Sequence, residues 1–183
     1  MGLDMMAGWA EPQPKPESNV VPIKKEELEI NAEFDWRKHS RLHNLMQTIW
    51  FCKKYEGTPV PPESGINRTN FNEGLDATAE DKLYIPEDQE ERAFLYRGLT
   101  VTIGTVIHEF NSGENVQLDK TDIKVIRDFV MNNSLPFCAD GMFWGHQFQE
   151  DAMKEYKDQD LEFCEKALKW LEEGKEVYYT SWW

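Results

Sequence analysis

The sequence predicts an α+β fold in which helices pack on one face of a small, mostly antiparallel sheet. Three observations lead to this prediction. The 183 residues suffice for one domain with its own core and are few for two. Segments with apolar residues at helical spacing alternate with segments rich in β-branched or aromatic residues. The chain also ends in a strongly aromatic segment, which a sheet can bury.

The N-terminal residues are expected to form an arm. Three prolines at alternate positions favour extended, unpaired backbone (Pro12, Pro14 and Pro16). Residues 1–18 are therefore predicted to be an extended or disordered arm, and residues 19–183 a single α+β domain. Within that domain, residues 56–92 are rich in Pro, Gly, Asn and acidic residues, which indicates a long acidic insertion.

The first predicted helix covers residues 34–54. Its apolar stripe recurs at positions i, i+3, i+4 and i+7 (Leu42, Leu45, Met46 and Ile49). Gly57 and the prolines that follow it are typical of a helix end.

Two further helices are predicted from their caps and apolar faces. Residues 120–133 follow Asp119, a favourable N-cap, and Asp122 places negative charge in the first turn. Residues 159–173 carry an apolar seam and end at Gly174, which suits the left-handed residue that closes a helix.

Four strands complete the predicted fold. Residues near 100–110 are mostly β-branched, and residues 115–118 return after an Asn-Ser-Gly turn. Residues 141–145 form a short aromatic segment between glycines. Residues 176–182 end the chain with several rings, each of which can bury about 150–250 Å². This last segment is expected to dock as a strand of the sheet or to act as a hook for a partner.

The charge of the chain is −14, with an isoelectric point near 4.7. Phosphate backbones need Lys and Arg, so direct binding of nucleic acid is disfavoured. Most of the negative charge lies in residues 72–92 and 149–165. The acidic segments predict a protein partner with a basic surface, or imitation of the charge of DNA. The acidic residues expected to face that partner are Glu87, Asp88, Glu90 and Glu91.

Aromatic residues are the second group of expected partner contacts. Seven Trp are more than one core of this size needs, and Trp and Tyr are the residues that anchor interfaces. Burial in the core and a role in an interface both remain open for this group. The candidates are Trp36, Trp144, Tyr178, Tyr179, Trp182 and Trp183.

His39 and His43 are four residues apart and so share one face of the predicted first helix. Two such imidazoles can supply half of a zinc site, and His108 or acidic residues could complete it. The alternative is a half-buried polar edge in which each histidine is hydrogen-bonded. No spacing fixes a third ligand, so the leading expectation is no cofactor, with zinc as the alternative.

Other function classes find little support in the sequence. Neither a Walker pattern nor a Rossmann fingerprint is present, so no phosphate-binding loop is predicted. The apolar stretches fall short of the ~20 residues that span a bilayer, and no secretory leader is predicted. Three cysteines far apart in sequence fit reduced thiols in a cytosol.

Several motifs together resemble a known family. They are Trp36-x-x-His39-x-x-x-His43, the Gly-aromatic-Gly segment of residues 141–145, and the closing Tyr178-Tyr179-Thr180-Ser181-Trp182-Trp183. The chain is similar here to a family of small uncharacterised proteins encoded by tailed bacteriophages, over roughly residues 35–54 and 115–183. This chain departs from the family in its N-terminal arm and in a long stretch where the family has a short linker.

The resemblance implies a phage origin and the cytoplasm of an infected bacterium. The leading functional prediction is a non-enzymatic accessory protein that binds a host or phage protein. Two alternatives stay open: a small metal-dependent enzyme that uses His39, His43 and His108, and a minor component of the virion.

Overall fold

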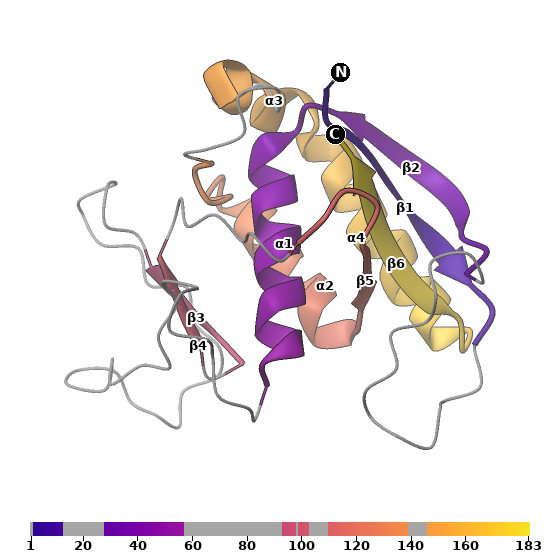
Figure 1. Ribbon diagram of the computed structural model, residues 1–183. Coiled ribbons are helices and arrows are strands. Elements are labelled where there is room, and N and C mark those ends of the chain that lie inside the picture. The colour runs from indigo at the N-terminus through magenta and orange to yellow at the C-terminus, as the bar shows by residue number, and fades with distance from the viewer. Residues whose placement is uncertain (1, 13–27, 57–92, 98, 103–109, 139–145) are drawn as a thin grey trace.

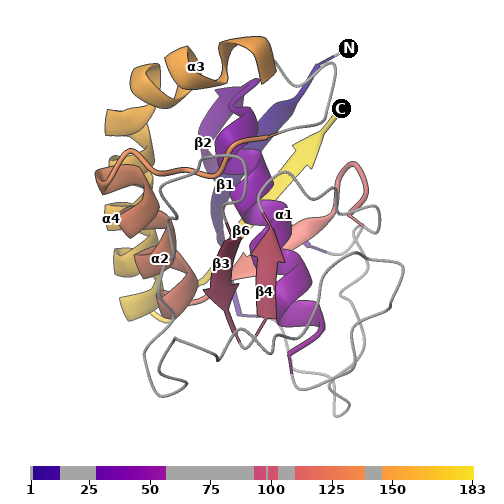
Figure 2. The ribbon, with the colours of Figure 1, turned by 90° about the vertical axis from the view of Figure 1, so that its left-hand side faces the viewer.

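The computed structural model describes residues 2–12, 28–56, 93–97, 99–102, 110–138 and 146–183. They form a four-stranded antiparallel sheet, a two-stranded hairpin, and helices that cover one face of the sheet (Figures 1 and 2). The strands of the sheet, in spatial order, are β2 (Asn31–Arg37), β1 (Asp4–Ala10), β6 (Glu176–Trp182) and β5 (Asn115–Leu118). The hairpin pairs β3 (Ala93–Tyr96) with β4 (Leu99–Thr102). The helices are α1 (Ser40–Lys54), α2 (Lys120–Met131), α3 (Gln149–Glu155) and α4 (Lys157–Glu172), with a 3-10 turn at His146–Phe148. The predicted α+β fold is confirmed.

The two ends of the chain lie side by side in the middle of the sheet. β1 and β6 pair in antiparallel register from Asp4 opposite Trp182 to Ala10 opposite Glu176. The predicted C-terminal strand is thus confirmed. The prediction that the N-terminus is an arm outside the domain is wrong for residues 4–10, because Met5 and Ala7 lie in the core.

The first helix begins later than predicted. Residues 34–37 belong to β2, and α1 starts at Ser40. Phe34 and Trp36 are buried, whereas Asp35 and Arg37 are exposed, which is the period of two expected for a strand with one covered face. The helix ends at Lys54, as predicted.

The predicted strand near 100–110 is only partly confirmed. Its described part, Leu99–Thr102, is a strand, but it pairs with β3 in a hairpin beside α1 and not with the main sheet (Figure 1). Phe110 lies outside any strand. Residues 103–109, the predicted strand at 141–145 and residues 57–92 of the acidic insertion lie outside the described residues.

The strand at Asn115–Leu118 and the two later helices follow the prediction closely. Asp119 caps α2: its carboxylate accepts from the backbone N–H of Asp122 (2.9 Å), and the Asp122 carboxylate accepts from the N–H of Asp119 (2.8 Å). Beyond α4, Gly174 has φ +81° and the N–H of Lys175 donates to the carbonyl of Trp170 (2.9 Å). The short helix α3 was not predicted.

Gly8 allows the start of β2 to cross close to β1. A Cβ at position 8 would overlap the carbonyl oxygen of Asn31 and lie 2.8 Å from the Cα of Ala32. The β1–β2 register shifts at this point, between Ala7 and Gly8. Leu28 and Ile30, which precede β2, border the same hollow as Thr180 on the face of the sheet away from the helices.

The core lies between the sheet and the helices. A cluster of rings joins β2 to α4: Phe34, Trp36, Phe163 and Trp170 have centroids 5.5–6.2 Å apart in the four contacting pairs. Branched residues of α1, α2 and β5 extend this core along the same face. In the described part of the chain, no helix is long and apolar enough to cross a membrane.

Candidate functional site

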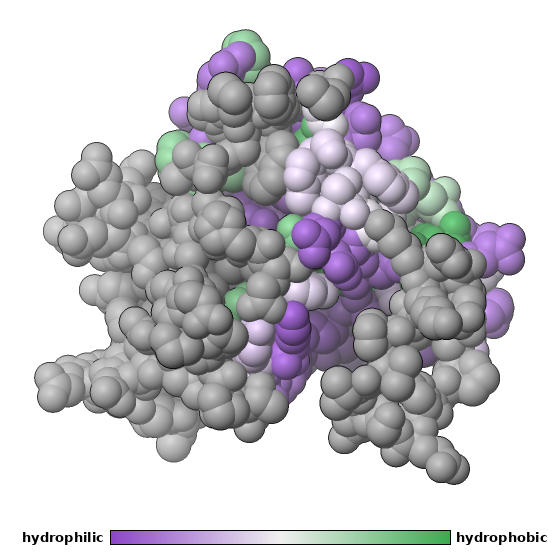
Figure 3. Space-filling view, in the orientation of Figure 1, coloured by the Kyte–Doolittle hydropathy of each residue, from purple (hydrophilic) through white to green (hydrophobic). Residues whose placement is uncertain are grey.

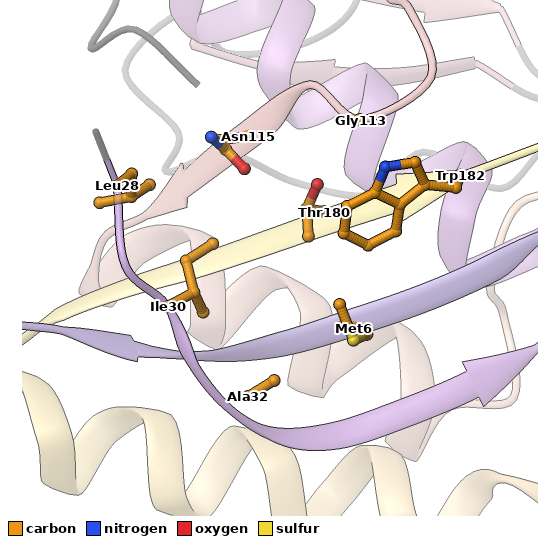
Figure 4. A pocket seen from close by; sticks show the side chains of 8 residues that line it. All are labelled: Met6, Leu28, Ile30, Ala32, Gly113, Asn115, Thr180 and Trp182. Carbon is orange, nitrogen blue, oxygen red and sulfur yellow. The ribbon is translucent and has the colours of Figure 1, made fainter. Parts of the chain in front are cut away.

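The face of the sheet away from the helices contains a hollow of about 200 Å³. Figure 1 shows α4 behind β1 and β6, so that this open face is turned toward the viewer. Residues 28–32 border the hollow on one side, and Gly113 and Trp182 border it on the other (Figure 4). Figure 3 shows pale and hydrophobic surface over β1, β2 and the end of β6 on this side of the molecule. The apolar lining residues are Met6, Leu28, Ile30 and Ala32.

Two polar side chains, Asn115 and Thr180, belong to the same hollow. Asn115 of β5 and Thr180 of β6 are directly opposite each other in the strand register. Thr180 lies between Ile30 and the ring of Trp182, with its hydroxyl on the side of Asn115 (Figure 4). Thr180 is only 4 % exposed, and its Oγ1 has no hydrogen-bond partner within the described part of the chain. The hollow therefore combines an apolar wall with an unsatisfied hydroxyl.

The last two residues both expose part of their rings: Trp182 borders this hollow, whereas the ring of Trp183 lies against His43 and Phe110. Trp182 is 43 % exposed and Trp183 38 %, although residues 177–181 before them are buried. The ring of Trp183 stacks on Phe110, and its backbone N–H donates to the Ser112 hydroxyl (3.1 Å). Trp182 is held by its strand pairing to Asp4. Both rings are thus presented from ordered backbone.

Three of the predicted partner contacts are buried in the folded chain. Trp36, Tyr178 and Tyr179 are at most 2 % exposed, which agrees with the core alternative for these rings, and contact with a partner through them stays a prediction. Trp182 and Trp183 remain available. Trp144 and the acidic residues Glu87, Asp88, Glu90 and Glu91 lie outside the described residues.

His39 takes part in a buried network that links the start of α1 to α4. The Asp160 carboxylate accepts from the indole N–H of Trp36 (2.8 Å) through Oδ1, and its Oδ2 lies 2.8 Å from Nε2 of His39. All three side chains are in the core. The His39 ring also stacks on Tyr156, at a centroid distance of 5.2 Å. This arrangement fixes β2, α1 and α4 relative to one another.

His43 points into a different part of the core. Its Nδ1 lies 2.7 Å from the hydroxyl of Tyr179. Complete burial lowers the pKa of His43 to about 3 and raises the pKa of Tyr179 well above its ordinary value. The imidazole is therefore neutral and the phenol protonated, so the pair adds no charge to the core.

His39, which precedes α1, and His43, which lies within it, thus have separate hydrogen-bond partners, as the alternative to a zinc site expects, although both rings are fully buried and not half-buried. No group of three His, Cys, Asp or Glu that could hold a metal ion occurs among the described residues. His108, the third predicted ligand, lies outside them. Zinc binding by His39, His43 and His108 stays a prediction.

A second buried charge was missed by sequence reasoning. The Asp122 carboxylate is fully buried and accepts hydrogen bonds from Lys53 (2.7 Å), Arg97 (3.2 Å) and the Tyr96 hydroxyl. Arg97 also donates to Asp119. The cluster joins the end of α1, the start of α2 and the β3–β4 hairpin. The capping pattern indicated Asp122, but its cationic partners come from distant segments.

This cluster is electrostatically balanced. Burial raises the pKa of Tyr96 above its ordinary value, and Asp122 beside it acts in the same direction. Desolvation opposes the charged form of Arg97, yet Asp122 and its other partners raise its pKa overall. Tyr96 therefore stays protonated and Arg97 cationic. The arrangement holds the hairpin against α1 and α2 and leaves no nucleophile exposed among its described members.

Comparisons of the chain with protein-family models, with curated protein sequences and with solved structures found no match.

Proposed function

We propose that this chain is a non-enzymatic accessory protein of a tailed bacteriophage that binds a protein partner through the open face of its sheet, with Trp182 as an anchor. The observation that carries the proposal is the 43 % exposure of Trp182 at the end of an otherwise buried strand, beside a hollow of about 200 Å³. Trp is strongly enriched among the residues that dominate binding energy at interfaces.

The anchor is already in position before a partner binds. β6 is an inner strand, so the backbone of Trp182 pairs with β1 at Asp4. An anchor held by the fold loses less conformational freedom on binding than one on a loose tail. This supports a binding surface at the C-terminal end of β6.

The partner is proposed to have a basic surface. A net charge of −14 attracts cationic surfaces and speeds their encounter at low ionic strength. The resemblance to tailed-phage proteins supports the infected bacterial cytoplasm as the place where the two meet.

The proposal is tested by affinity capture from phage-infected cells with the full chain and two variants. Trp182→Ala removes the anchor, and Met131→Ala is the matched control, because Met131 is 52 % exposed on α2, among the helices of the other face. A specific partner is expected with the natural chain and with Met131→Ala, and not with Trp182→Ala. It should be released at about 1 M salt, where the Debye length falls to about 3 Å.

The captured protein is then purified and its affinity measured directly. Trp182→Ala is expected to raise the dissociation constant about 30-fold, which corresponds to a loss of about 2 kcal/mol in binding free energy. Equal affinities of Trp182→Ala and Met131→Ala, or capture of the same proteins by both, would contradict the proposed surface.

A further inference from the structure

The hollow beside Trp182 contains an unusual hydroxyl. Thr180 Oγ1 is buried, and no described residue supplies it with a hydrogen-bond partner. Buried polar groups are nearly always satisfied, and leaving one unpaired is unfavourable. Asn115 lies directly across the β5–β6 pair, with its side chain on the same face (Figure 4). Together the two residues offer both hydrogen-bond donors and acceptors to a ligand.

The other walls define what kind of group fits. Met6, Ile30 and Ala32 present apolar atoms, and the ring of Trp182 closes one side. None of the eight described residues that line the hollow carries a charge. A phosphate, carboxylate or ammonium group would lose its hydration here without gaining a partner of opposite charge. The occupant is therefore uncharged and mainly apolar, with a polar group beside Thr180.

The size of the hollow further limits which chemical groups can occupy it. Its volume of about 200 Å³ is below the roughly 300–1,000 Å³ of sites that enclose drug-sized molecules. It equals the liquid volume of roughly six or seven water molecules, each about 30 Å³. Such a space suits one side chain and an adjoining peptide group, and is too small for a nucleotide or a large cofactor.

We propose that this hollow binds one uncharged, apolar side chain of the partner protein, and that the peptide group next to that side chain hydrogen-bonds to Thr180 and Asn115. The inference rests on the proposed function, because it names the part of the partner that the open face recognises. Trp182 packs against the inserted side chain, and the Thr180 hydroxyl forms a hydrogen bond with the peptide group.

The probe for this pocket is N-acetyl-leucinamide, a single apolar side chain between two peptide groups. It is titrated into the full ¹⁵N-labelled chain while backbone amide and indole resonances are followed. Saturable shifts are expected at Asn115, Thr180 and the Trp182 indole. N-acetyl-lysinamide, which carries a charge, is expected to leave these resonances in place. Shifts spread over other surfaces, or equal responses to both probes, would overturn the proposal.

Three variants test the role of the hydroxyl. Thr180→Val keeps the β-branched shape and removes only the unpaired group, and it is expected to weaken N-acetyl-leucinamide binding about fivefold or more. Gln117→Val, an exposed change two pairs further along the same two strands, is expected to leave binding unaltered. Ala32→Leu fills the hollow and is expected to abolish binding. Unchanged binding in a folded Thr180→Val variant would overturn the assignment of this residue, and its thermal unfolding is expected to occur at the same or a higher temperature than that of the natural chain, because the unpaired hydroxyl is gone.

The titration and the affinity capture can contradict the two proposals separately. If capture depends on Trp182 but N-acetyl-leucinamide shifts no resonance of the pocket, the proposed pocket is contradicted and the proposed binding function is supported. Pocket shifts without a captured partner would support the pocket and contradict the proposed function.

Discussion

His39 and Asp160 lie 121 residues apart in sequence, and Nε2 of the histidine is 2.8 Å from Oδ2 of the aspartate in the core. The same carboxylate accepts from the indole of Trp36, so one side chain of α4 holds both the end of β2 and the residue before α1. A fully buried carboxylate with two donors is costly to disturb, because each donor loses its partner away from water.

Asp160→Asn is expected to lower the free energy of unfolding by about 1–3 kcal/mol, because Trp36 and His39 would lose a charged acceptor and keep only a neutral amide as their partner. Urea unfolding followed by circular dichroism measures this value. The control is Asp158→Asn, an exposed residue in the first turn of the same helix, which is expected to change stability by at most about 0.5 kcal/mol. Similar losses in both variants would mean that the buried network contributes no special stability.

The neutral state of His43 predicts loss of stability in acid. Its pKa is about 3 in the folded chain and 6.5 in the unfolded chain, so the unfolded state binds the extra proton between these values. Stability then falls as the pH falls from about 6.5, by about 1.4 kcal/mol per pH unit from this group alone. Above pH 6.5 the group is neutral in both states and contributes no slope.

The measurement compares urea unfolding of the natural chain and of His43→Gln between pH 7 and about pH 4. Glutamine can still bond the Tyr179 hydroxyl but does not titrate. The free energy of unfolding of the variant, relative to that of the natural chain, should therefore rise steadily as the pH falls below 6.5. The carboxylates titrate in both proteins and do not affect this difference. Parallel stability curves would show that His43 does not resist protonation in the fold.

Gly8→Ala is expected to destabilise the chain by about 3 kcal/mol or more, because the new methyl group would overlap the Asn31 carbonyl and backbone atoms cannot turn aside. Gly174→Ala is the contrasting variant: it has open space around its Cβ and carries only the cost of φ +81°, about 1 kcal/mol. Thermal unfolding of the two variants compares steric overlap with backbone strain. A larger loss for Gly174→Ala would argue against the close approach of β2.

Asp122→Asn is expected to cost about 3–5 kcal/mol, because Lys53 and Arg97 would keep their positive charges beside a neutral amide. Asp119→Asn is the matched change, since asparagine caps a helix as well as aspartate does. It should cost about 1 kcal/mol or less, through the lost pairing with Arg97. Chemical denaturation gives both values, and near-equal losses would contradict a central role of Asp122.

The candidate site was only partly predictable. Exposed aromatic anchors at the C-terminus were expected, and Trp182 and Trp183 fit that expectation. A period-two reading of β6 places Thr180 and Trp182 on one face, which is a signal that the sequence does contain. The sequence gives no indication that Asn115 and residues 28–32 would lie beside Thr180 and Trp182. Their proximity depends on the strand register and on the close approach at Gly8.

Local patterns by themselves determined α2, α4 and the closing strand. The Asp119–Asp122 cap, the glycine at 174 and the dense rings of residues 176–182 each act over a few neighbouring residues, so one sequence suffices to find them. Only the tertiary structure decided that residues 4–10 enter the middle of the sheet and that Phe34 and Trp36 belong to a strand. The physical reason is that strand pairing and burial are energies of contact between distant segments. A short apolar segment has no strong preference for helix or strand until a partner strand and a core face are present.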